Sequence, residues 1–177
     1  SLEDNTALTI SNLCKELHKK HILFAGNVPT LITKFCDLLE IPYYDFMKVE
    51  KVAILNSIAT GEGAIMEAIQ KSPRNLQASN CLVLGYGRCG TVLAKKLWGL
   101  HANVWIGVRN EIAMYQGISH GYHGILLAEL KEKISQYDYI FNSIPEVILD
   151  HELLDELSPT TTIIDIASYP GGLDYNY

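Results

Sequence analysis

Residues 81–110 read CLVLGYGRCGTVLAKKLWGLHANVWIGVRN, an apolar run, a glycine cluster, an amphipathic run and a second apolar run. The glycines at Gly85, Gly87 and Gly90 have the spacing G-x-G-x-x-G. This motif is weak alone, but here it follows an apolar strand pattern and opens a run with leucines at helical spacing, which is the context it requires. The stretch therefore predicts a strand, a tight turn, a helix and a second strand that together bind a dinucleotide.

Each glycine of the motif has a predicted role. The first permits the tight turn, the second lets a pyrophosphate approach the backbone, and the third lets the helix pack closely on the strand. Free N–H groups at the helix N-terminus then bind the phosphates. The alternative is a tight turn without a ligand. The predicted cofactor contacts in this loop are Gly85, Tyr86, Gly87, Arg88, Cys89 and Gly90.

Arg109 stands at the end of the second predicted strand, where NAD-specific sites usually have Asp or Glu to accept from the ribose 2′-hydroxyl. The first acid, Glu111, lies in the next predicted helix. A guanidinium at this position pairs with a 2′-phosphate through charge-assisted hydrogen bonds. Val108, Arg109 and Asn110 are therefore predicted to contact the cofactor, which is predicted to be NADP. The alternative is a solvated arginine beside a site that also accepts NAD.

The chain downstream of Cys81 alternates regularly between strand and helix patterns. Strands are predicted at 81–85, 103–108, 122–126, 137–142 and 161–166, and helices near 88–99, 110–117, 127–135 and 148–157. Such alternation is typical of an α/β fold with helices on both faces of a parallel sheet. Residues 81–177 are therefore predicted to form a Rossmann-type doubly wound domain that binds NAD(P).

Two polar loops follow the fourth and fifth predicted strands, FNSIP at 141–145 and DIASYPGG at 165–172. Ligands of open α/β sheets bind at the carboxyl ends of the strands, so these loops are predicted to flank the nicotinamide ribose and the substrate. The alternative is ordinary turn chemistry, because Ser, Pro and Gly are common in loops. The predicted contacts are Ser143, Ile144, Pro145, Asp165, Ala167 and Ser168.

The first 58 residues predict part of an N-terminal α/β lobe that binds substrate. Helix patterns at 5–17 and 29–40 alternate with strand patterns at 21–26 and 42–46. Residues 48–58 are ambiguous. Thr60 is predicted to cap a helix that ends before Pro73, so that residues 59–80 form a linking helix and a connector.

The linking segment also carries the predicted substrate-facing residues. The polar side chains in question are Asn56, Ser57, Thr60 and Glu62, which are expected to line the cleft between the lobes. Glu62 is a weak candidate for the group that handles protons. No stronger general acid or base emerges from the sequence.

Composition excludes several classes. The net charge of −6 over 177 residues, without clustered Lys and Arg, argues against a nucleic-acid surface. No uninterrupted apolar run reaches the ~18 residues of a membrane span, and the N-terminus lacks a secretory pattern.

His120 and His123 could form a metal pair, but no third ligand lies at a recognisable spacing, so a solvated loop and no metal are predicted. The four cysteines are expected to be free thiols in a reducing cytoplasm; Cys89 is expected to serve in packing rather than as a reactive thiolate.

Four blocks of the sequence together resemble the A subunit of bacterial dipicolinate synthase. They are LNSIATGEGAIMEAIQ, VLGYGRCGTVLAKKLWGLHANVWIGVRN, FNSIPEVILDHELL and IIDIASYPGGLDY, and they span about residues 54–175. Of these, IDIASYPGG is more specific than the glycine motif, because generic dehydrogenases diverge there. The two-lobed plan is more distantly similar to D-2-hydroxyacid dehydrogenases.

This resemblance implies an enzyme of the mother-cell cytoplasm of spore-forming bacteria. The implied reaction oxidises a dihydropyridine dicarboxylate to dipicolinate with NADP as the hydride acceptor. The implied partner is a small, flavoprotein-like second subunit; self-association into a homo-oligomer is left open. The alternatives are a 2-hydroxyacid-dehydrogenase-like oxidoreductase and a non-catalytic nucleotide-binding subunit that assembles or regulates a partner enzyme.

The chain departs from the family pattern in two ways. NSIPT of the family is NSIAT here, with Ala59 in place of proline, which predicts a looser loop. The family also extends beyond this chain at both ends, which implies that part of the substrate lobe lies outside the sequence.

Overall fold

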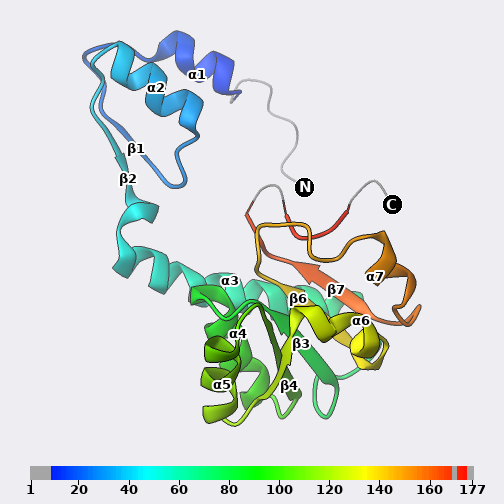
Figure 1. The fold of residues 1–177 in the computed structure, drawn as a ribbon. Helices are drawn as coiled ribbons and strands as arrows, with labels where there is room; N and C mark the ends of the chain where they lie inside the picture. Colours follow the sequence, from blue (N-terminus) through cyan, green and yellow to red (C-terminus); the bar gives the residue numbers. More distant parts are fainter. Residues whose placement is uncertain (1–8, 169–170, 175–177) are drawn as a thin grey trace. The chain divides into compact units, whose positions relative to one another are not determined.

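The computed structural model describes residues 9–168 and 171–174 (Figure 1). The chain divides into two compact units, Ser1–Ala53 and Ile54–Tyr177. We call them the first unit and the second unit.

The second unit is built on one sheet of five parallel strands, and the predicted α/β fold class is confirmed. The strands are β3 (Asn80–Leu84), β4 (Asn103–Val108), β5 (His123–Leu126), β6 (Tyr139–Asn142) and β7 (Thr162–Asp165). Their spatial order is β5-β4-β3-β6-β7. The chain thus builds outward from β3 in one direction and then returns to build from β6 in the other. This reversal between β3 and β6 is the point at which doubly wound sheets bind ligands.

Helices cover both faces of this sheet. They are α3 (Glu50–Lys71), α4 (Arg88–Gly99), α5 (Glu111–Ser119), α6 (Leu130–Lys133) and α7 (His151–Asp155), with 3₁₀ turns η3 (Leu127–Glu129) and η4 (Ile134–Gln136) beside α6. Side chains of α3, α4 and α5 pack in one cluster, and those of α6 and α7 in another. The two clusters meet opposite faces of the sheet.

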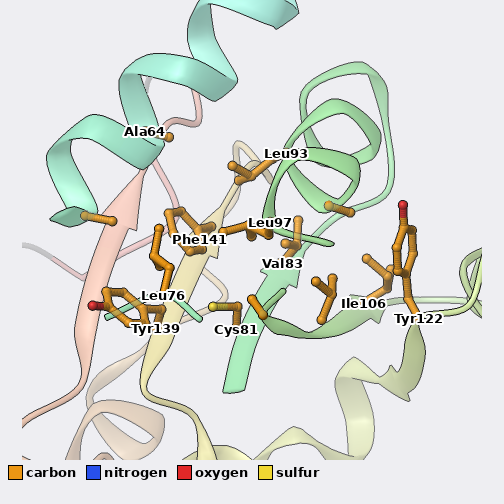
Figure 2. Packing of buried hydrophobic residues seen from close by; sticks show 14 of the residues in the cluster. Ala64, Leu76, Cys81, Val83, Leu93, Leu97, Ile106, Tyr122, Tyr139 and Phe141 are labelled. Atoms are coloured by element: carbon orange, nitrogen blue, oxygen red, sulfur yellow. The ribbon is translucent and has the colours of Figure 1, made fainter. Parts of the chain in front are cut away.

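The central strand β3 supplies apolar side chains to both clusters, which explains its continuous apolar run. Cys81 and Val83 pack with the α3 and α4 side chains shown in Figure 2. Leu82 and Leu84 belong to the cluster with α6 and α7. All four side chains have no exposed surface. Successive residues of a strand point to opposite faces, so a strand covered on both faces is apolar throughout.

The helix α3 corrects the sequence interpretation of residues 48–60. It begins at Glu50 rather than at Thr60, so the prediction that Thr60 caps the helix is wrong. Instead, the Thr60 hydroxyl donates to the carbonyl of Asn56, one turn earlier, at 3.1 Å. Residues 50–60 contain neither Gly nor Pro, and nothing interrupts the backbone ladder. Ala59 lies inside the helix, so the looser loop expected there is also wrong; alanine is a strong helix former.

The same helix is long and apolar enough to cross a membrane, judged by length and composition alone. Its most apolar 18-residue window has a mean hydropathy of 1.2, and 28% of that window is buried within the protein. Ala64 on α3 packs against the sheet (Figure 2), and Ala68 belongs to the same buried cluster, as in the core helix of a globular domain.

The helix predicted at 148–157 is shorter in the structure. The Asp150 carboxylate accepts from the Leu153 N–H at 3.0 Å and thereby caps α7. Before this cap, the N–H groups of Ile148 and Leu149 donate to the carbonyl of Gly172. The backbone at 148–149 is therefore used to hold the C-terminal segment rather than to extend the helix.

The first unit is a small α/β layer, as predicted. It contains α1 (Ile10–Glu16), β1 (Leu23–Ala25), α2 (Thr30–Leu38), β2 (Tyr43–Asp45) and the 3₁₀ turn η2 (Phe46–Lys48). The strands are parallel, and Ile32, Cys36 and Ile41 form the buried core. Residues 5–8 of the first predicted helix lie outside the described residues.

Candidate functional site

The glycine-rich turn after β3 has the geometry that its sequence predicts. Gly85 has φ +91°, a conformation that side chains with a Cβ rarely adopt. A Cβ added to Gly90 would lie 2.1 Å from the Gly85 carbonyl oxygen. Only a residue without a side chain therefore allows α4 to approach the end of β3 this closely.

Gly87 faces a different environment. A Cβ built on it meets no heavy atom within 4 Å, so it borders open space. It is also the N-cap residue of α4, and no side chain caps that end of the helix. Helix N-termini carry free N–H groups and a partial positive charge, which suits them to bind phosphate.

This uncapped helix end opens onto a pocket of about 400 Å³, which we call the α4 pocket. Its lining residues come from the glycine turn, the loop after β6 and the loop after β7: Gly85, Gly87, Arg88, Cys89, Ser143, Ile144, Pro145, Ile166 and Ser168. The structure thus brings together predicted residues from three segments at the carboxyl edge of the sheet.

A second pocket of about 320 Å³ lies beside it, and the two share Gly85, Ile144 and Pro145. We call it the Arg109 pocket. The lining residues are Gly85, Tyr86, Val108, Arg109, Asn110, Ala113, Ile144, Pro145 and Glu146. A dinucleotide has two ends joined by a pyrophosphate, and two adjoining pockets, one of them lined by a helix N-terminus, match that shape.

Arg109 is half exposed and forms an ion pair with the carboxylate of Glu146. Asn110 has a structural task, because its Oδ1 accepts from the N–H of Ala113 at 2.9 Å and caps α5. Both residues line the Arg109 pocket, but the Asn110 side chain also caps a helix, whereas the Arg109 guanidinium pairs with another lining residue of the pocket.

Tyr86 ties the glycine turn to the segment before β5. Its hydroxyl lies 2.6 Å from Nδ1 of His120. Burial raises the pKa of Tyr86, and the neighbouring Tyr122 raises it further, so the hydroxyl is neutral at physiological pH. His120 is exposed in the turn after α5, in agreement with the predicted solvated loop, and its ring also contacts Tyr86 of the glycine turn. His123 stacks on Trp105 with ring centroids 4.7 Å apart.

The loops after β6 and β7 are held by a hydrogen-bond network. Asn142, fully buried, donates from Nδ2 to the carboxylate of Asp165 at 2.9 Å and exchanges two further bonds with the backbone of Ile144. The Asp165 carboxylate also accepts from the N–H groups of Ala167 and Gly172. Asp165 and Ala167, predicted to touch the cofactor, lie within this network and line neither pocket. Tyr169 and Pro170 of DIASYPGG, and Tyr175 beyond it, lie outside the described residues.

The hydroxyl of Ser143 is hydrogen-bonded to the backbone. Its Oγ donates to the carbonyl of Leu84 at 2.8 Å, and its N–H donates to the same carbonyl at 3.0 Å. These bonds join the end of β6 to the start of the glycine turn. The side chain therefore shapes the wall of the α4 pocket.

The predicted substrate-facing residues lie on α3 and line neither pocket. Ser57 is buried, and its hydroxyl donates to the Ile54 carbonyl at 2.6 Å. Asn56 is exposed. The carboxylate of Glu62 forms an ion pair of 2.7 Å with Lys96 on α4. Their place beside a substrate, and the role of Glu62 in proton transfer, stay predictions.

The cysteines and histidines provide no metal centre within the described ranges, where no three His, Cys, Asp or Glu side chains gather. Cys14, Cys36, Cys81 and Cys89 are free thiols. Burial raises the pKa of Cys89 and outweighs the opposite effect of Arg88. This agrees with the predicted packing role rather than with a thiolate activated by the helix end.

Four residues of the site were missed in the sequence. Ala113 and Glu146 line the Arg109 pocket, Ile166 lines the α4 pocket, and Asn142 supports the two loops. Glu146 directly follows NSIP, so its position after a strand was visible. Its pairing with Arg109, 37 residues away, depends on the tertiary structure.

No protein-family model matches the chain. The A subunit of dipicolinate synthase from Bacillus subtilis (strain 168) is 39% identical over 128 residues, which make up 72% of this chain and 43% of that protein. The chain therefore spans about half or less of the length of the relatives it matches.

Solved structures give the same result. The crystal structure of the dipicolinate synthase A chain from Bacillus subtilis has a TM-score of 0.82 at 32% identity, covering 96% of this chain and 57% of that one. The corresponding protein from Bacillus halodurans has a TM-score of 0.83 at 30% identity, covering 88% and 54%. A transhydrogenase from Sinorhizobium meliloti, at a TM-score of 0.75 and 18% identity over 91% of this chain and 57% of that one, shares the fold. The chain thus belongs with the A subunits of dipicolinate synthases, with which it shares sequence and a Rossmann-type fold over about half of their length.

Proposed function

We propose that the second unit binds NADP across the two adjoining pockets. The observation that carries this proposal is the N-terminus of α4, which no side chain caps and which opens onto the α4 pocket beside the open face of Gly87. The pyrophosphate binds there, the adenine ribose enters the Arg109 pocket, and the nicotinamide end meets the loops at Ser143 and Ser168. Arg109 pairs with the 2′-phosphate, which selects NADP over NAD.

We further propose that the complete protein oxidises a dihydropyridine dicarboxylate to dipicolinate. The kinship with dipicolinate synthases supports this reaction. The bound nicotinamide supplies an acceptor for a hydride, and loss of a proton from the substrate ring completes the aromatisation. The residues of this chain position the cofactor and exclude water around it, with Ile144, Pro145 and Ile166 as the apolar part of the wall.

The relatives are named as one lettered subunit of their enzyme, which supports a partner subunit for this chain. We propose that this partner is flavoprotein-like.

The proposed location is the cytoplasm of the mother cell in a spore-forming bacterium. A 2-hydroxyacid dehydrogenase is less well supported, because the curated relative at 39% identity and the solved structures at 30–32% identity are A subunits of dipicolinate synthase. A non-catalytic nucleotide-binding subunit is the competing function of another class.

Titration of the protein with NADP, NAD and dipicolinate, followed by an assay of cofactor reduction with the dihydropyridine substrate, tests the proposal. The assay is run with and without the second subunit. NADP binding with turnover supports the enzyme. NADP binding without turnover under both conditions favours an assembly role, and absence of binding by either dinucleotide overturns the proposal.

A further inference from the structure

We infer that Glu146 is a specificity-determining residue, which competes with the cofactor 2′-phosphate for the guanidinium of Arg109. This inference rests on the proposed function, because it concerns the same pocket. It assigns to the loop after β6 a part in the choice between NADP and NAD. That choice is usually attributed to the end of the second strand alone.

The contacts place Glu146 in the wall of the Arg109 pocket. Arg109 enters the pocket from the end of β4, and Glu146 enters from the loop after β6. The Arg109 guanidinium, through Nη2, donates to Oε2 of Glu146, and the two groups form an ion pair. The pair therefore spans the pocket between its two walls.

The loop that carries Glu146 is anchored two residues earlier, at the backbone of Ile144. Asn142 binds the backbone of Ile144 through both its amide oxygen and its amide nitrogen. Pro145 then restricts the backbone immediately before Glu146. The carboxylate is thus presented to Arg109 by a loop that is itself anchored to β6.

A 2′-phosphate and the Glu146 carboxylate are both anions, and both bind the guanidinium of Arg109. A guanidinium has five donors in a planar fork, and one anion occupies its bidentate face. When a 2′-phosphate binds Arg109, Glu146 must turn away or remain beside a second anion, and like charges at such distances repel. A ribose 2′-hydroxyl is neutral and imposes neither condition. Glu146 therefore weakens NADP binding selectively.

The exposure of the pair determines how large this effect is. The side chains of Arg109 and Glu146 are 52% and 62% exposed. Exposed ion pairs are weak, so the 2′-phosphate can displace the Glu146 carboxylate from Arg109. Removing the charge of Glu146 should therefore tighten NADP binding only about two- to fivefold. The ion pair thus adjusts how strongly the pocket prefers NADP over NAD and does not block the pocket.

The experiment measures Kd by calorimetry for 2′,5′-ADP and 5′-AMP, which differ only in the 2′-phosphate and lack the nicotinamide. The variants are E146Q, R109A and R109A/E146Q. We expect E146Q to tighten binding of 2′,5′-ADP about two- to fivefold and to leave the Kd of 5′-AMP within about twofold of the wild-type value. In the R109A background, the selective effect of E146Q on 2′,5′-ADP should be smaller, because the contested cation is absent and only the like-charge repulsion remains.

The matched control is E111Q, which removes the same charge from the first turn of α5, outside the lining of the pocket. Equal tightening by E111Q and E146Q, equal tightening of both nucleotides, or weaker binding of either by E146Q overturns the role of Glu146. So does a wild-type protein that prefers 2′,5′-ADP and is unchanged by E146Q. A wild-type protein that binds neither nucleotide instead overturns the proposed function, and this inference with it.

Discussion

The side-chain amide of Asn142 donates a hydrogen bond of 2.9 Å to the carboxylate of Asp165, and so joins the ends of β6 and β7. The same carboxylate accepts from the N–H of Gly172 at 2.8 Å. A Cβ on Gly172 would lie 1.8 Å from Nδ2 of Asn142. The loops that border the α4 pocket therefore depend on a compact group of polar contacts beneath them.

Asp165→Asn should destabilise the second unit by about 1–3 kcal/mol, because the new amide places a donor against the donors of Asn142, Ala167 or Gly172. The free energy of unfolding measured in urea gives this value. E132Q, at an exposed acid on α6, is the control and should change stability by less than about 0.5 kcal/mol. Equal stability of D165N and wild type would contradict a structural role for the carboxylate.

Gly90→Ala should disrupt the glycine turn, because its methyl group would lie 2.1 Å from the Gly85 carbonyl oxygen. Backbone must shift to relieve this contact, so we expect a loss of at least about 1–3 kcal/mol and weak or absent dinucleotide binding. Thermal unfolding and NADP titration measure the two effects. Gly63→Ala is the control, since its Cβ meets nothing within 4 Å on α3 and should stabilise the protein by about 0.5–1 kcal/mol. Similar behaviour of both variants would argue against close packing at Gly90.

Arg109→Ala should weaken NADP about tenfold or more and change NAD much less, because only NADP loses a charge-assisted hydrogen bond. Fluorescence titration with both reduced cofactors compares the two. Lys95→Ala removes the same charge from an exposed position on α4 and controls for the overall field. An equal loss for both cofactors would contradict the assignment of Arg109 to the 2′-phosphate.

The first unit should lose stability in acid through Asp45. Burial raises the pKa of this carboxyl, but N–H donors of Val28, Asn27 and Met47 outweigh it, and the net pKa is lowered. A lowered folded pKa means that the stabilisation is complete above the unfolded value of about 3.9 and is lost as the pH falls through the folded value. A carboxyl NMR titration gives the pKa directly.

The Asp45→Asn variant supplies the matched comparison for this pH dependence. Near pH 6 the variant should be less stable than the wild type, because it lacks the ionised carboxyl. This difference should shrink below about pH 4, where the wild-type carboxyl becomes protonated. Circular dichroism melts of both proteins across this range measure it. A difference that stays constant with pH would contradict the linkage.

Local sequence patterns were sufficient to predict most strands and helices of the second unit. The apolar run of β3, the glycines at Gly85 and Gly90 and the helical spacing after them require a strand, a tight turn and a close-packed helix, whatever surrounds them. The start of α3 could not be read in the same way, because residues 50–58 carry apolar side chains without a clear period, and packing of Ala64 and Ala68 on the sheet supports a helix that continues back to Glu50.

The sequence by itself determined the parallel α/β class, the glycine turn and the cation at the end of β4, because these depend on residues close together in the chain. The tertiary structure decided which distant groups meet. It paired Arg109 with Glu146, joined Asn142 to Asp165 and placed Tyr86 against His120. Such pairs arise where parallel strands bring their carboxyl ends to one edge, and side-chain partners across that edge have no periodicity that a linear sequence can display.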